Sequence, residues 1–146
     1  MTGVQTCALP IFRRFQKQQA SPADVAEYLR TFAITHVVVQ MPRADLARAT
    51  AALEELPQVG RRHVYRTRFP VQRVLEGGGS VRARTNRLFV SDSDEGRDVV
   101  LSYHFHEQLV CEPGCRVERA HVRLDDVGFV RVTAPHPRAF VVRLQY

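Results

Sequence analysis

The run "AFVVRLQY" at Ala139–Tyr146 carries the clearest structural signal in this chain. Its residues alternate between an apolar set and a mixed set, which are Phe140, Val142, Leu144 and Tyr146 on one side and Val141, Arg143 and Gln145 on the other. Successive side chains of a β-strand point to opposite faces of the sheet, so the run predicts a strand with one face buried.

Similar runs fill the preceding 60 or so residues, and they fix the predicted fold class. They are "RTNRLFVS", "RDVVLSYHFH", "CRVERAHVRL" and "GFVRVTA", separated by the turn-forming runs "DSDEG", "CEPGC", "DDVG" and "PHPR". In the second run, the core face is expected to carry Val99, Leu101, Tyr103 and Phe105. Several short strands with regular turns predict an antiparallel β-sandwich-like region. The preceding "VLEGGGSV" is expected to be a flexible, glycine-rich stretch.

The sequence before Phe69 has a different pattern. "SPADVAEYLRTF" predicts a helix, with Ser21 as cap and Pro22 in the first turn, and with one apolar face of Val25, Tyr28, Leu29 and Phe32. "THVVVQ" predicts a strand buried on both sides in a parallel sheet. A second helix is expected over "RADLARATAALEEL", stopped by Pro57, and then a strand over "RRHVYRTR". The predicted fold is α+β, with a small α/β unit over 21–68 and a β-rich region over 69–146, together forming one compact domain.

The opening run "MTGVQTCALPI" has no charge and no helix or strand period. It resembles the translation of a common sequencing adapter. We therefore expect residues 1–11 to lie outside the native protein, so that Cys7 has no biological role. Residues 12–20 are expected to be a connector from an upstream part, which makes the chain a C-terminal piece of something longer.

Composition restricts the function classes. The formal net charge is +6, and Lys17 is the only basic residue that is not arginine. The arginines are spread along the sequence among acidic residues, whereas a nucleic-acid site should cluster them, so nucleic acid is not expected as a partner. No apolar run reaches the 18 residues of a membrane helix, so the region itself is expected to be soluble.

Two histidines and two cysteines are the candidate metal ligands. His104 and His106 in "YHFHE" would lie on one side of a strand and resemble the H-x-H of cupins, but no Glu or Gly follows at the cupin spacing. Cys111 and Cys115 flank a Pro-Gly turn with a C-x₃-C spacing that is unusual for zinc. We therefore do not expect these four side chains to bind a metal ion. The cysteines are equally compatible with a disulfide across the turn and with two unpaired buried thiols.

The remaining motifs are weaker. "DSDEG" contains Asp92, Asp94, Glu95 and Gly96 but lacks the final Glu of a calcium loop, so a solvated hairpin turn is expected. "EGGGS" lacks the residues of a phosphate-binding loop. We find no convergent acid, base, nucleophile or metal set, so neither catalytic residues nor a cofactor are expected in this region.

Four segments together resemble a known family. Ile34–Val39, Val64–Arg66, Leu101–His104 and Phe129–Val132 resemble the extracytoplasmic C-terminal region of bacterial polytopic membrane proteins of the GT-C glycosyltransferase type. These include integral membrane proteins labelled as related to 6-pyruvoyl-tetrahydropterin synthase. The resemblance covers roughly 22–146, and the sequence departs from it at "EQLVCEPG". The family's catalytic acids lie upstream, so none can be assigned here.

The resemblance implies an accessory extracytoplasmic domain that is structural or contacts glycan or cell-wall polymer. Its expected partners are the transmembrane region of the same protein and the membrane surface, which Phe12 and Phe15 could reach. An exposed apolar patch is expected on the α/β unit, where the membrane-proximal part would pack. Two alternatives remain open, a free-standing cupin-like metal enzyme and a nucleic-acid-binding module.

Overall fold

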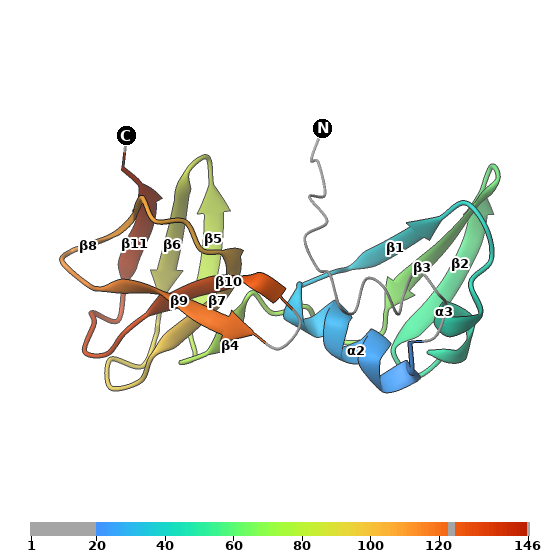
Figure 1. Cartoon of the computed structure of the whole chain (residues 1–146), viewed down its shortest axis with the longest axis horizontal. Helices are drawn as coiled ribbons and strands as arrows, with labels where there is room; N and C mark the ends of the chain where they lie inside the picture. Colours follow the sequence, from blue (N-terminus) through green and yellow to red (C-terminus); the bar gives the residue numbers. More distant parts are fainter. Residues whose placement is uncertain (1–19, 123–124, 146) are drawn as a thin grey trace. The chain divides into compact units, whose positions relative to one another are not determined.

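The computed structural model describes residues 20–122 and 125–145, with 12% helix and 47% strand over three antiparallel sheets. The expectations for residues 1–19, and for Tyr146, lie outside these residues. The chain divides into two compact units, one ending at Gln72 and the other beginning at Arg73 (Figure 1). The α+β fold class is confirmed. The prediction that both units form a single domain stays a prediction.

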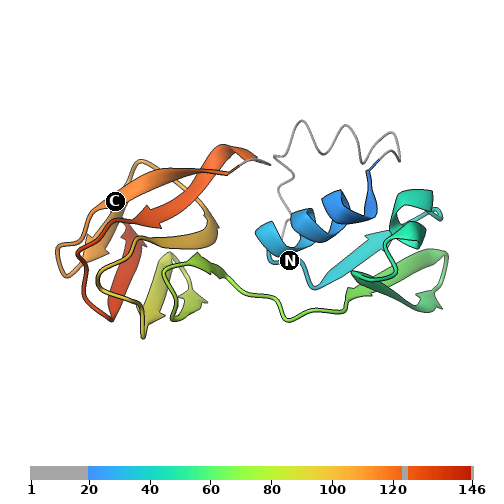
Figure 2. The ribbon, with the colours of Figure 1, turned by 90° about the horizontal axis from the view of Figure 1, so that it is seen from below.

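The N-terminal unit is a three-stranded antiparallel sheet with two helices on one face (Figure 2). Its elements are α2 (Pro22–Thr31), β1 (His36–Val39), α3 (Ala44–Arg48), β2 (Leu53–Val59) and β3 (Arg62–Thr67), with the strands in the order β1-β3-β2. Val25 and Leu29 of α2 pack with Leu46 of α3 against Leu53 and Tyr65 of the sheet.

Helix α2 begins where the sequence predicts. The Ser21 side chain accepts a hydrogen bond from the Asp24 backbone N–H, and the Asp24 carboxylate accepts one from the Ser21 N–H. These reciprocal bonds satisfy two donors that every helix start leaves unpaired. Pro22 occupies the first turn, where its missing N–H costs nothing. The predicted cap is confirmed, and so is the burial of Val25 and Leu29, whereas Tyr28 and Phe32 of the predicted apolar face are half-buried.

Two predictions for this unit are wrong. The second helix ends at Arg48 instead of running to Leu56, because residues 53–59 form β2 and pair with β3. Strand β1 is not buried on both sides in a parallel sheet, since it pairs antiparallel with β3 at the edge and its burial alternates. Pro57 does not stop a helix but lies in edge strand β2, at a shift of register between Leu56 and Val59, where its missing N–H breaks no regular pairing.

The C-terminal unit is a sandwich of two four-stranded antiparallel sheets. Its strands are β4 (Val74–Glu76), β5 (Ser80–Arg84), β6 (Arg87–Ser91), β7 (Val99–His104), β8 (Leu109–Glu112), β9 (Val117–Val122), β10 (Asp125–Val132) and β11 (Phe140–Leu144). One sheet has the order β4-β7-β10-β9 and the other β5-β6-β11-β8. The chain crosses between the two sheets after β4, β6, β7, β8 and β10 (Figure 1).

The core of this unit lies between the two sheets. Leu101 and Val130 from one sheet and Phe140 and Val142 from the other belong to a single buried cluster, and all are at most 3% exposed. The predicted apolar face of the last strand is therefore confirmed for its described residues. On β7 the prediction holds for Val99 and Leu101, but Val100 and Ser102 on the opposite face are buried as well.

The glycine-rich stretch is an ordered connection between β4 and β5. Gly77 and Gly79 adopt φ angles of +82° and +87°, which L side chains rarely adopt. A Cβ on Gly77 would lie 2.8 Å from the Val99 Cα, and one on Gly79 would lie 2.9 Å from the Ser93 N. The stretch expected to be flexible is therefore packed closely, at Gly77 and Gly79, against the backbone of residues 91–99.

Candidate ligand pockets and the disulfide

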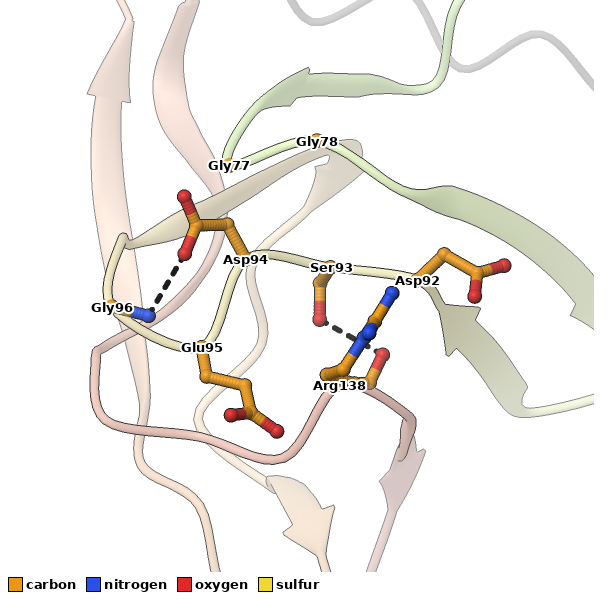
Figure 3. Close-up of a pocket in the computed structure, with 8 residues that line it drawn as sticks. All are labelled: Gly77, Gly78, Asp92, Ser93, Asp94, Glu95, Gly96 and Arg138. Atoms are coloured by element: carbon orange, nitrogen blue, oxygen red, sulfur yellow. Dashed lines mark hydrogen bonds between the residues drawn. The ribbon is translucent and has the colours of Figure 1, made fainter.

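The "DSDEG" run lines a polar pocket at one end of the sandwich (Figure 3). The pocket has a volume of about 490 Å³ and its lining residues come from three connections: Gly77 and Gly78, the segment Asp92–Gly96, and Arg138. The expected hairpin turn is wrong, because β6 and β7 belong to different sheets and the segment crosses between them. The pocket therefore forms where three loops meet at the rim.

Backbone hydrogen bonds hold these loops together. Buried Ser93 donates from its N–H and from its Oγ to the Arg138 carbonyl, at 3.1 Å in each case. The Asp94 N–H donates to the Gly77 carbonyl at 3.0 Å. Between two of the same connections, the buried His136 ring contacts the Arg97 carbonyl with Nε2 at 2.8 Å and the Pro137 carbonyl with Nδ1 at 3.0 Å. All of these bonds end on backbone carbonyls, so they fix the backbone positions of the loops that form the pocket.

The carboxylates of this pocket do not converge. Figure 3 shows the Asp94 side chain turned back toward Gly96, whose N–H donates to Asp94 Oδ1 at 3.1 Å, while Asp92 and Glu95 point in other directions. Across residues 20–122 and 125–145, no three His, Cys, Asp or Glu side chains are grouped closely enough to hold a metal ion. The pocket suits a polar ligand that makes several separate hydrogen bonds.

A second pocket opens between the sheets at the other end of the C-terminal unit. It has a volume of about 290 Å³, and Val130 and Val142, both fully buried, lie at its base. Arg84 and Arg87 contribute to its lining from the β5–β6 hairpin, and His104 contributes from the end of β7. The two pockets are at opposite ends of the same hairpin, since Ser80 pairs with Ser91 and Arg84 with Arg87.

His104 and His106 do not share one side of a strand. Strand β7 ends at His104, whose ring lies 5.7 Å from that of Phe129. His106 belongs to the following turn, where its Nδ1 accepts a hydrogen bond from the Gln108 N–H. The cysteines of the mixed ligand set are bonded to each other, so they offer no thiolate to a metal.

Cys111 and Cys115 form a disulfide across the Glu112–Gly114 turn, with their Cα atoms 5.1 Å apart. This distance lies inside the usual range for a bridge. Cys111 is buried in the core through β8, and Cys115 packs against the same cluster just before β9. The bridge therefore joins the two sheets where the chain crosses between them.

Sequence reasoning found the acidic residues of the polar pocket but missed its partners. Arg138 lies more than 40 residues after "DSDEG", and Gly77–Gly78 precedes it by two strands, β5 and β6. No local signal in the sequence connects these segments. The buried ring of His136 was also missed, since "PHPR" indicates a turn but not what the turn packs on.

No protein family, curated protein or solved structure matches the chain. In the part of the chain that the structure describes, no helix has both the length and the apolar character needed to cross a membrane.

Proposed function

We propose that this chain is an accessory extracytoplasmic domain of a polytopic membrane protein of the GT-C glycosyltransferase type. Its role there is structural, and the N-terminal unit docks on the rest of the same protein. The observation that carries the proposal is the uncovered face of sheet β1-β3-β2, which bears a row of apolar side chains. The disulfide adds support, because disulfides persist in oxidising compartments.

The apolar row follows from the strand register. Val38 pairs with Val64, and Val64 pairs with Leu56, so the three side chains share the face opposite to the helices. Val59 pairs with Arg62, which places it on the same face. Val38 and Val59 are 54% and 67% exposed. An apolar row that water reaches on an otherwise packed sheet is typical of a docking surface.

The rest of this sheet face limits which partner it accepts. Beside the apolar row, Arg66 donates to the Glu54 carboxylate at 2.7 Å, which holds the pKa of Glu54 below its usual value. A partner that covers the apolar row would therefore meet a charged pair that is already neutralised. A membrane-proximal segment of the same protein would fit this arrangement if it presents apolar side chains to the row and few unpaired charges.

The polar pocket supports glycan contact as a second role of the same domain. Sugar hydroxyls both donate and accept hydrogen bonds, and the lining of the pocket includes Arg138 as a donor and Asp92 and Glu95 as acceptors. Titration of ¹⁵N-labelled protein with cell-wall oligosaccharides should shift the amide signals of residues 92–96 and 138. Unchanged signals there would remove glycan contact from the proposal.

Recovery of the coding sequence upstream of residue 12 tests the family assignment. Several apolar spans directly before Phe12 are expected, and a soluble upstream domain would overturn the proposal. Docking is then tested in the recovered full-length protein in intact cells, with an impermeant thiol reagent. Thr50→Cys, exposed in the same unit, should react, whereas Val38→Cys should react much more slowly. Equal rates would contradict docking, and no reaction at Thr50→Cys would contradict the extracytoplasmic location.

A further inference from the structure

The outer face of sheet β5-β6-β11-β8 gathers arginines that lie far apart in the sequence. Val81, Val90 and Val142 point to the core, so the residues between them point outward. The register then aligns Arg84, Arg87 and Arg143 in one row across three strands. Arg82 lies in the adjacent row, beside Phe89. We call the surface of Arg82, Arg84, Arg87 and Arg143 the arginine face.

Apolar side chains lie among these arginines. Phe89 and Val141 are paired neighbours in the row of Arg82, and Val110 ends the row of Arg143. All three are half-buried, although they point away from the core. The face therefore alternates cationic groups with an aromatic and two aliphatic side chains.

One acidic residue, Glu112, lies among the four strands of this sheet, and it is already paired. Its Oε1 accepts a hydrogen bond from Arg143 Nε at 2.8 Å and forms an ion pair with Nη2 of the same guanidinium at 2.6 Å. This bond and the charges of Arg143 and Arg87 hold the pKa of Glu112 below its usual value. Glu112 is thus ionised at neutral pH and compensates Arg143, while Arg82, Arg84 and Arg87 remain exposed cations on the face.

We infer that the arginine face binds the surface of a lipid bilayer that contains anionic phospholipids. Arginine guanidinium groups pair well with phosphate, and each cation near an anionic bilayer strengthens binding. Aromatic and aliphatic side chains between the cations can enter the interfacial layer, which a purely electrostatic partner would not use. A sheet face also presents these groups on one surface, as a bilayer requires.

Single-stranded nucleic acid is the competing anionic partner. Sheets that bind it stack two or three bases on aromatic side chains of neighbouring strands. Here Phe89 has Val141 and Arg82 as its cross-strand neighbours, so one base at most could stack. The observations therefore favour a bilayer. The inference does not depend on the family proposed above, because an anionic bilayer could recruit this face in any protein.

Sedimentation of the full chain with vesicles tests the inference. Vesicles of phosphatidylcholine with 30% phosphatidylglycerol should bind the chain, and pure phosphatidylcholine should not. Changing Arg82, Arg84 and Arg87 together to Ala should weaken binding by roughly 100-fold, since each cation near such a surface contributes about fivefold. The matched control changes Arg48, Arg61 and Arg62 of the N-terminal unit to Ala, which removes the same charge and should weaken binding much less.

Two further sets of variants separate the effect of charge from that of the guanidinium and aromatic groups. The triple exchange of Arg82, Arg84 and Arg87 to Lys keeps the charge and should retain most of the binding, and circular dichroism checks that each variant folds. Phe89→Ser should lower the binding that persists at high salt. Equal losses in the test and control triples would show that net charge alone is responsible and would overturn the inference. Binding to single-stranded RNA in the absence of vesicle binding would overturn it in favour of nucleic acid.

Discussion

The two units bury the apolar faces of their sheets in different ways. The N-terminal unit covers one face of its sheet with α2 and α3 and leaves the apolar row of Val38 in water. The C-terminal unit stacks two sheets so that each covers the other, and Leu101 and Val142 at its centre are fully buried. The difference implies that apolar packing dominates the stability of the C-terminal unit, whereas the N-terminal unit relies on fewer contacts and on one buried ion pair.

The largest effect is expected from truncating a side chain between the stacked sheets. Leu101→Ala should lower the free energy of unfolding of the C-terminal unit by about 3 kcal/mol, through lost burial and the cavity left behind. The matched change on the open face, Val38→Ala, should cost about 0.5 kcal/mol or less, because Val38 is 54% exposed. Urea unfolding followed by circular dichroism measures both. Equal costs would contradict the contrast between the two units.

Substitutions in Gly77–Gly79, the connection between β4 and β5, test whether close packing extends to the end of the sandwich. Gly77→Ala and Gly79→Ala should each cost about 2–3 kcal/mol, because the added methyl group meets backbone atoms of the β6–β7 segment. Gly78→Ala is the control, since it has a φ of +67° but no atom within 4 Å of the new Cβ, so only the backbone penalty of about 1–2 kcal/mol applies. A larger loss at Gly78 than at its neighbours would show that the connection is not packed as described.

The apolar stripe of the predicted second helix, over residues 43–56, shows which predictions were correct in the N-terminal unit. Leu46, Ala49, Leu53 and Leu56 recur at helical spacing, which predicts one buried stripe. The prediction is correct for the first three, which are at most 4% exposed, and wrong for Leu56, which pairs with Val64 on the opposite face of the sheet. The element type is wrong after Arg48, because Leu53 reaches the same core from a strand. Pairing with β3 outweighs local helix propensity here, and no glycine or proline marks the break.

The C-terminal unit was more predictable because its signals are local. Alternation over residues 140–144 depends on the period of a strand alone, and the core face of Phe140 and Val142 follows from it. The polar pocket and the arginine face could not be predicted in this way. Both depend on which strands become neighbours, and the pairing of β6 with β11 joins residues 50 to 56 positions apart.

The buried ion pair is the next test of the N-terminal unit. Asp45 is fully buried and accepts hydrogen bonds from Arg43 Nε at 3.1 Å and Nη2 at 2.8 Å. Asp45→Ala should cost about 2 kcal/mol, because it leaves Arg43 partly buried without this partner. Glu54→Ala breaks the exposed pair with Arg66 and should cost distinctly less. If both changes had equal effects on the urea midpoint, burial of the pair would not contribute to stability.

The smallest expected effect concerns pH and is confined to the N-terminal unit. Tyr65 is 3% exposed, and burial raises the pKa of its hydroxyl, with smaller contributions from the charges of Glu55 and Asp45. The folded pKa is therefore higher than the unfolded value of about 10. Below pH 10 both states keep the proton and Tyr65 causes no pH dependence. Above pH 10 the unfolded state loses its proton first, so stability falls until the folded pKa is reached. Unfolding in urea between pH 8 and 11 should show this decline for the N-terminal unit, and Tyr65→Phe should make it shallower. The same slope in both proteins would show that Tyr65 titrates as if exposed, and a slope carried by the C-terminal unit would assign it to other groups.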